Sequence, residues 1–226
     1  MHTDSNRVNV INERSQLAGA RMKGKLVSIE GIDGCGKTTH VRLLAEWLRS
    51  QGYKVVVTDE PTDGMIGRII KRALRGEFKL SVAAEALLFA ADRVQHITEL
   101  IGPALAAGKT VITERYFYSS LAYQSARGLS MAWLESINRA AMKPNLVILI
   151  DLPADAALQR IKRSRKLDKF EMDLQLQRRV RANYLRIARL KGFKIVNGER
   201  PIDEVQADIR KIVSTTFSTI DQIKQI

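Results

Sequence analysis

The chain has 226 residues, of which 45% are hydrophobic and 27% charged, which argues against intrinsic disorder of the whole chain. No apolar run approaches the roughly 20 residues that cross a bilayer, so a membrane-embedded protein is not indicated. The formal net charge of +13 and the pI of about 10.1 leave acidic partners open, nucleic acids among them.

Residues 1–24 are polar and lack the apolar centre of a signal peptide, so we expect a mobile extension on a cytoplasmic protein. Residues 25–216 are expected to form one domain, because an α/β chain of this length usually builds a single core. Residues 217–226 are expected to be a C-terminal tail. The one cysteine, Cys35, cannot form an intramolecular disulfide and agrees with a reducing compartment.

Short apolar runs alternate with helical patterns along the rest of the chain. Such alternation is typical of a parallel sheet whose strands are joined by crossover helices. The first helix is expected from Lys37 to about Gln51, where Gly52 can adopt the left-handed conformation that ends it. We therefore predict a doubly wound α/β domain with a five-stranded parallel sheet flanked by helices. The strands are expected at residues 26–29, 55–57, 111–113, 146–150 and 195–196.

The stretch EGIDGCGKTTH between the first strand and the first helix contains the phosphate-binding motif G-x-x-x-x-G-K-[ST]. Glycines let backbone N–H groups surround an anion, and the helix N-terminus adds its positive end. We expect Lys37 to neutralise the outer phosphates as a catalytic group, and the Thr38 hydroxyl to reach Mg²⁺. The loop predicts nucleoside triphosphate binding, but hydrolases, motors, GTPases and kinases share it. The expected ATP-binding residues are Gly31, Ile32, Asp33, Gly34, Cys35, Gly36, Lys37, Thr38 and Thr39.

Cys35 lies inside this loop, where a helix N-terminus can lower the pKa of a thiol. A small residue that fits a crowded loop is the plainer interpretation, because no catalytic base lies beside it. We expect Cys35 to take no part in the reaction but to be sensitive to alkylation.

Positive charge is concentrated in residues 160–191, which contain twelve Lys or Arg and three acidic residues. A solvated helix face explains part of this run, namely Arg186, Arg189 and Lys191. The densest part is RIKRSRKLDKFE, at residues 160–171.

Five segments together resemble the thymidylate kinase family, in order from about residue 25 to 212. They are GIDGCGKTT, TDEPTDGMIG, LLFAADR, ITERYFYSSLAYQ and RIKRSRKLDKFE. The resemblance implies a P-loop nucleoside monophosphate kinase fold and transfer of the γ-phosphoryl group of ATP to dTMP. It also implies a Mg²⁺ requirement, a homodimer, and a basic lid at about residues 160–171.

Aromatic and basic residues in these segments make chemical sense as an acceptor site. Phe89 can stack on a base, with Arg93 one helical turn later on the same face. The pair by itself favours a core residue at position 89, and the family resemblance favours the base contact. Arg115 follows a strand end, where its guanidinium can bind a monophosphate by two bonds, with an ion pair to Glu114 as the alternative. The expected dTMP-binding residues are Asp33, Glu60, Phe89, Arg93, Arg115, Ser120, Tyr123 and Gln124.

The resemblance assigns further roles. Ser120 faces the base, and Tyr123 packs near the sugar, where a 2′-hydroxyl would crowd it. Asp33 is a carboxylate beside two polyphosphates, which requires a partner such as a metal, water or a sugar hydroxyl. By resemblance Asp33 works on the acceptor side, and with Arg115 it is expected to be catalytic. Glu114 is expected to hold Mg²⁺ with Thr38, with a structural ion pair as the alternative.

Two segments depart from the family pattern. Glu114-Arg115-Tyr116 replaces Asp-Arg-Tyr, which lengthens the carboxylate by one methylene. Ser164-Arg165 replaces the Arg-Gly of the lid, and Gly34 stands where some members have a catalytic arginine. The lid is therefore expected to supply the catalytic cation. Its candidate arginines are Arg160, which keeps its family position, and the substitutes Arg163 and Arg165.

Two other functions remain open. A kinase for another nucleoside monophosphate fits the same motifs. A nucleic-acid-binding ATPase is motivated by the charge of +13, but the charge is concentrated at the lid and no aromatic residues interleave with it as in a stacking platform. The absence of an N-K-x-D motif disfavours a GTPase. We expect ATP and dTMP as ligands, a homodimer, and neither nucleic acid nor membrane as a partner.

Overall fold

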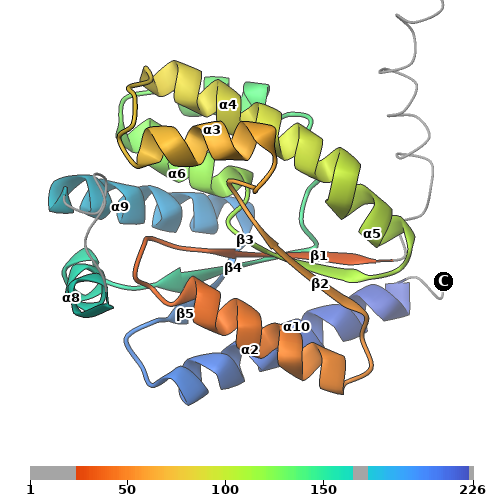
Figure 1. Cartoon of the computed structure of the whole chain (residues 1–226). Coiled ribbons are helices and arrows are strands. Elements are labelled where there is room, and N and C mark those ends of the chain that lie inside the picture. Colours follow the sequence, from red (N-terminus) through yellow and green to blue (C-terminus); the bar gives the residue numbers. More distant parts are fainter. Residues whose placement is uncertain (1–23, 165–172, 224–226) are drawn as a thin grey trace, which may run out of the picture.

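The structure is a computed structural model that describes residues 24–164 and 173–223, without the side chains of Arg163, Ser164 and Ile223. In these ranges one five-stranded sheet carries helices on both faces (Figure 1). The strands are β1 (Lys25–Glu30), β2 (Val55–Asp59), β3 (Thr110–Glu114), β4 (Leu146–Asp151) and β5 (Lys194–Asn197). The helices are α2 (Lys37–Ser50), α3 (Met65–Leu74), α4 (Val82–His96), the π-helical η1 (Ile97–Ile101), α5 (Gly102–Ala106), α6 (Phe117–Ala126), α7 (Met131–Ile137), α8 (Ala154–Ser164), α9 (Leu174–Lys191) and α10 (Ile202–Ile223).

The sheet has the strand order β2-β3-β1-β4-β5, and every neighbouring pair is parallel. β1 is the central strand, with Val27 opposite Ile112 of β3 and Leu146 of β4. All six β1 residues are buried, as expected for a strand covered on both faces. The predicted α/β fold is confirmed, and each predicted strand lies within an observed one.

Helices cover the sheet in two layers (Figure 1). α2 and α10 lie together on one face, and α6 and α9 lie with α4 and α5 on the other, where α3 packs outside α4. α2 ends one residue before the expected Gln51, and Gly52 has the left-handed φ of +85° that stops it. None of the helices in the described ranges is long and apolar enough to cross a membrane.

The last helix extends past the expected end of the domain at residue 216. Phe217 is 2% exposed and packs edge-on against Tyr53, with 5.5 Å between the ring centroids. The Lys25 Nζ lies 4.9 Å from the centroid of the Phe217 ring and forms a salt bridge with Asp221 Oδ1 at 2.7 Å. These contacts make α10 part of the domain, so a tail does not begin at residue 217.

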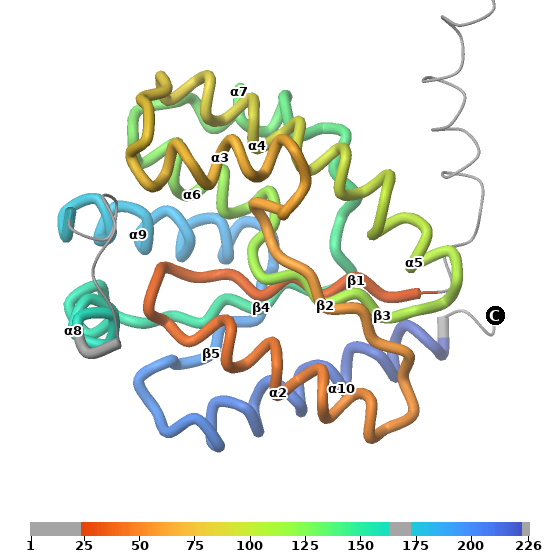
Figure 2. The backbone as a smooth tube through the Cα atoms, viewed as in Figure 1, coloured from red at the N-terminus to blue at the C-terminus, as the bar shows by residue number. Residues whose placement is uncertain are grey.

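The carboxyl ends of the parallel strands meet at one edge of the sheet. The loop after β1 leads from this edge into α2. α8 and the beginning of α9 lie beside the same edge of the sheet (Figure 2). Open α/β sheets bind ligands at this edge, close to the strand where the chain reverses its direction across the sheet.

Candidate active site

The loop between β1 and α2 has the backbone that a phosphate-binding loop requires. Gly31, Gly34 and Gly36 have positive φ values of +147°, +78° and +97°. A Cβ atom on Gly34 would lie 2.6 Å from the Ala157 carbonyl oxygen of α8, so the helix leaves room only for glycine. The Lys37 Nζ is directed into the loop, where it donates to the Ile32 carbonyl at 2.9 Å. The nine expected ATP-binding residues are consecutive and form this loop and the first turn of α2.

Cys35 fits the plainer of its two interpretations, a small residue in a crowded loop. Its side chain is 1% exposed, and burial raises the pKa of its thiol despite the nearby charge of Lys37. The alternative interpretation, a thiol whose pKa is lowered by the helix N-terminus, is therefore not supported. A Cβ atom on Gly31 would lie 2.6 Å from the Cys35 Sγ, which supports the interpretation of Cys35 as a small residue in a crowded loop.

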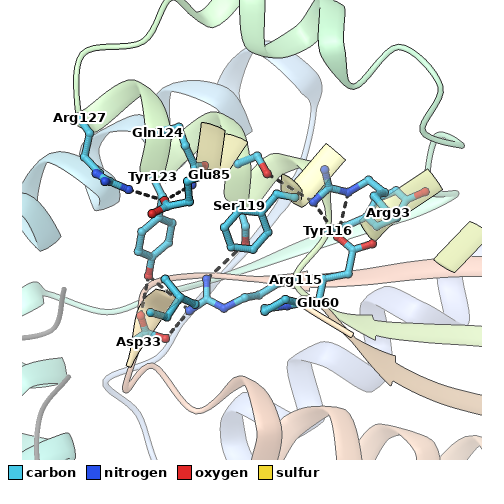
Figure 3. A pocket seen from close by; sticks show the side chains of 14 residues that line it. Asp33, Glu60, Glu85, Arg93, Arg115, Tyr116, Ser119, Tyr123, Gln124 and Arg127 are labelled. Atoms are coloured by element: carbon cyan, nitrogen blue, oxygen red, sulfur yellow. Dashed lines mark hydrogen bonds and ion pairs between the residues drawn. The ribbon is translucent and has the colours of Figure 1, made fainter. Parts of the chain in front are cut away.

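One pocket lies between the phosphate-binding loop and the helices above it (Figure 3). α4 and α6 contribute half of the residues that line it, and the segments after β2 and β3 also border it. All eight residues that the sequence predicts for the acceptor line this pocket, although they come from positions between 33 and 124. The eight are Asp33, Glu60, Phe89, Arg93, Arg115, Ser120, Tyr123 and Gln124.

Arg115 connects the pocket to the phosphate-binding loop. Its Nη2 donates to Asp33 Oδ1, and Tyr123 donates its phenolic hydrogen to Asp33 Oδ2 at 2.9 Å. The guanidinium also lies 5.0 Å over the Tyr123 ring. Arg115 has the left-handed φ of +65°, a conformation that is uncommon for non-glycine residues and is enriched at active sites. The alternative ion pair with Glu114 is not among the contacts of the described residues.

The surroundings keep Asp33 and Arg115 ionised and the phenol of Tyr123 neutral. Burial by itself would raise the pKa of Asp33, but the charges of Arg115 and Lys37 outweigh it and lower the pKa to about 2. Burial opposes the charge of Arg115, whereas the Asp33 carboxylate raises the pKa of Arg115 well above its usual value. Burial raises the pKa of Tyr123, so its phenol stays protonated and donates.

Arg93 lies at the inner end of the pocket in a buried polar network. Its Nε donates to Glu60 Oε2 at 2.8 Å, and its Nη2 lies 2.6 Å from the same oxygen. Its other donors reach Asn138 Oδ1 and, at 3.4 Å, Ser120 Oγ. His96 Nδ1 lies 3.1 Å from the second oxygen of Glu60. Asn138 and His96 were not predicted, because no local motif links them to residues so distant in the sequence.

A second polar group closes the outer end of the pocket. Glu85 Oε1 accepts hydrogen bonds from Gln124 Nε2, at 3.0 Å, and from Arg127. Glu85, Phe89 and Arg93 recur every four residues along one face of α4, all lining the pocket. That spacing is the signal by which the sequence could have revealed Glu85.

The two residues predicted for Mg²⁺ lie on a neighbouring cavity that Thr38, Asp59 and Glu114 line. Asp59 pairs in register with Glu114 at the ends of β2 and β3. Among the described residues no three His, Cys, Asp or Glu side chains are grouped to hold a metal. The oxygen donors nevertheless fit Mg²⁺, which keeps water and phosphate ligands and needs only one or two carboxylates or hydroxyls from a protein.

α8 brings the first lid arginine close to the phosphate-binding loop. Arg160 is exposed, and its Nη2 donates to the Gly198 carbonyl at 2.9 Å. Burial lowers the pKa of His40, in the first turn of α2, and the positive charge of Arg160 lowers it further. Arg160 therefore lies near the N-terminus of α2. The Arg163 side chain and all of Arg165 lie outside the described part of the chain.

A five-stranded parallel sheet whose glycine-rich loop is joined by an arginine to a neighbouring pocket is typical of P-loop kinases. The thymidylate kinase family model matches residues 29–209. A probable thymidylate kinase of Pyrococcus horikoshii is 48% identical over 198 residues, covering 85% of this chain and 97% of the relative. Another from Pyrococcus abyssi is 49% identical with the same coverage. One from Archaeoglobus fulgidus is 40% identical over 191 residues, covering 84% and 95%. The chain belongs to the thymidylate kinase family.

Proposed function

We propose that the chain is a dTMP kinase, which transfers the γ-phosphoryl group of ATP to dTMP and gives dTDP and ADP for dTTP synthesis. The family match supports this activity. The observation that carries it is the ion pair between Arg115 and Asp33, because it joins the phosphate-binding loop to the pocket of the eight expected acceptor residues. Phosphates bound on either side of Arg115 are then neighbours.

On the donor side, the backbone of residues 31–36 and the N-terminus of α2 bind the ATP phosphates. Lys37 and Arg160 stabilise the negative charge of the transferring group, Lys37 from within the loop and Arg160 from α8. Phosphoryl transfer needs mainly positioning and charge stabilisation, so no covalent intermediate with the protein is required. The lid at 160–171 excludes water that would otherwise hydrolyse ATP.

On the acceptor side, Phe89 stacks on the thymine, and Arg93 faces its edge from a fixed position. Arg115 holds the acceptor phosphate, and the Asp33 carboxylate orients Arg115 toward it. Tyr123 packs where a 2′-hydroxyl would lie, so the deoxyribose is preferred. The bond from Tyr123 to Asp33 supports this role, because it fixes the phenol ring in the wall of the pocket.

Mg²⁺ is the cofactor that the family implies, and Thr38 and Glu114 are the residues that would hold it. Bound there, the ion would neutralise charge between the phosphates. Removal of Mg²⁺ with a chelator should abolish turnover, and restoring the ion should recover it.

We further propose a cytoplasmic homodimer. Met65 and Ile69 on α3 are 75% and 37% exposed, and Leu87 and Val94 on α4 are 50% and 45% exposed. Apolar side chains gathered on two adjacent helices favour association with a second copy. Light scattering on the purified protein measures the oligomeric state directly.

The activity is tested by coupled release of ADP with dTMP, dUMP, dCMP, UMP and AMP as acceptors. We expect dTMP to have the highest kcat/KM. A higher value for another monophosphate would replace dTMP in the proposal. ATPase activity that DNA stimulates, without phosphorylation of any monophosphate, would favour a nucleic-acid-dependent enzyme instead.

A further inference from the structure

Glu30 is the last residue of β1 and directly precedes the phosphate-binding loop. Its side chain is fully buried. Its Oε1 accepts a hydrogen bond from Ser28 Oγ at 2.8 Å. Its Oε2 accepts from Ser119 Oγ at 2.8 Å and from the Tyr184 hydroxyl at 3.1 Å. Hydroxyl groups from β1, α6 and α9 therefore converge on a single carboxylate.

A carboxylate at this position has to offset the cost of its burial. Burial raises the pKa of Glu30, and the bonds from Ser119 and Ser28 and the charge of Arg115 act against this rise. The contacts of Glu30 on the side of the pocket offer a reason for a polar residue at this position.

Ser119 lies between Glu30 and Arg115. Its Oγ accepts a hydrogen bond from Arg115 Nη1 at 3.3 Å, and this contact is visible in the pocket (Figure 3). A serine hydroxyl has one hydrogen and two lone pairs. Because Ser119 gives its hydrogen to Glu30, its lone pairs are left to face Arg115. Arg115 can only donate, so by taking the Ser119 hydrogen Glu30 keeps the hydroxyl turned with a lone pair toward the guanidinium.

Arg115 requires support of this kind. Its backbone is in the left-handed region, and its side chain is only 16% exposed. On the side of the loop, Asp33 and the Gly31 carbonyl, 3.5 Å from Nη1, hold the guanidinium. On the side of α6, Ser119 is the partner that links it to a second buried carboxylate.

We propose that Glu30 is a positioning residue, which acts through Ser119 to hold the Arg115 guanidinium in the orientation that binds the acceptor phosphate. The proposal rests on the proposed function for the role of Arg115. Tyr184 brings α9 into the same network, since its hydroxyl lies 2.7 Å from Ser119 Oγ as well as near Glu30. The helix that follows the proposed lid thus contacts the group that holds Arg115.

The test compares three variants that each remove one hydroxyl group: Ser119→Ala, Tyr184→Phe and Ser28→Ala. Ser28→Ala is the matched control, because it also removes a donor from Glu30 but on the oxygen remote from Ser119. Steady-state kinetics are measured with the monophosphate that the wild type uses best. We expect Ser119→Ala to raise the KM for the acceptor about tenfold and Tyr184→Phe about threefold. The KM for ATP should stay within about twofold in all three variants, and Ser28→Ala should leave both KM values within that range.

The ratio of the two KM values decides the outcome, because partial loss of folded protein changes the apparent kcat but not KM. An unchanged acceptor KM in Ser119→Ala and Tyr184→Phe overturns the proposal. So does a Ser28→Ala variant whose acceptor KM rises as much as that of Tyr184→Phe, since the effect would then not run through the oxygen of Glu30 that Ser119 contacts. A wild type that prefers another monophosphate to dTMP contradicts the proposed function but leaves this comparison valid.

Discussion

The guanidinium of Arg93 lies against the carboxylate of Glu60 inside the pocket, with 2.6 Å between Nη2 and Oε2 and 2% of each side chain exposed. The charge of Arg93 is thus neutralised within the protein. Its planar group is also fixed, because Asn138 accepts from Nη1 on the other side. A group fixed in advance loses little conformational freedom when it meets a base.

The first prediction concerns the stability of this pair. Glu60→Ala should lower the free energy of unfolding by about 3 kcal/mol, because it leaves a guanidinium buried without its counter-charge. Adding Arg93→Met should recover part of that loss. The exposed pair of Arg42 and Glu46 is the control, and Glu46→Ala should change stability by less than about 0.5 kcal/mol. Urea unfolding measures all three, and equal losses in Glu60→Ala and Glu46→Ala would contradict the argument.

The second prediction concerns the phosphate-binding loop. Lys37→Ala should reduce kcat/KM by at least about 100-fold, because the lost charge acts on the transferring phosphoryl group. Lys54 provides the control, because it is exposed and directly precedes β2, at the end of the strand remote from the phosphate-binding loop. Lys54→Ala should retain nearly full activity. Turnover at the wild-type level in folded Lys37→Ala would remove this lysine from the mechanism.

The elements and the pocket could be predicted because their signals are local. The central strand, the glycine-rich loop and the lysine of α2 follow one another within residues 25–37. Phe89 and Arg93 show the spacing of a helix face, and Arg115 follows a strand end. The carboxyl ends of parallel strands meet at one edge, so motifs that are far apart in the sequence come together there.

Partners that depend on three-dimensional packing could not be predicted. Asn138 reaches Arg93 from α7, and Tyr184 reaches Glu30 across 154 positions of sequence, with no pattern that connects them. The sequence left two interpretations of Cys35 open, because it shows the helix N-terminus but not the burial of the thiol, which raises its pKa. The sequence also does not show that Phe217 is buried, so the continuation of the domain past residue 216 was not predicted.

The third prediction concerns acid stability. The pKa of Asp33 is lowered from 3.8 to about 2, so its pairing stabilises the folded state above about pH 4 and is lost as the pH falls toward 2. Asp33→Asn should therefore lower the melting temperature at pH 7 and pH 5 by similar amounts. The difference from the wild type should narrow at pH 3. A difference that stays constant down to pH 3 would mean that the Asp33 carboxylate does not titrate as inferred.

The fourth prediction concerns the lid. Arg160→Ala should lower kcat by at least about 100-fold and change the KM for dTMP less, as expected for a charge that acts in the transition state. Lys162→Ala is the control, because Lys162 is an exposed cation two residues further along α8. An effect on KM alone would assign Arg160 to ground-state binding. A larger loss in Arg163→Ala or Arg165→Ala would move the catalytic role to the residues that depart from the family pattern.

The fifth prediction concerns the choice of base. Stacking on Phe89 tolerates any base, so selectivity must come from the base edges and the methyl group. A buried methyl group contributes about 0.8 kcal/mol by transfer, and in a fitted pocket it discriminates roughly 10- to 200-fold at most. Uracil should therefore be accepted as a poorer base, with dUMP a real substrate. UMP should rank below dUMP, because Tyr123 crowds the 2′-hydroxyl.

Cytosine differs from uracil in kind, because it presents an amino donor where thymine and uracil present the 4-position oxygen. Arg93 has donors only, and its bonds to Glu60 and Asn138 prevent it from turning away. A mismatch of this type can reduce kcat/KM by about 10⁴-fold, well beyond the effect of the methyl group. The order of kcat/KM should be dTMP, then dUMP, then dCMP far behind. If dCMP equals or exceeds dUMP, Arg93 does not read the base, and a broader pyrimidine monophosphate kinase becomes the better description.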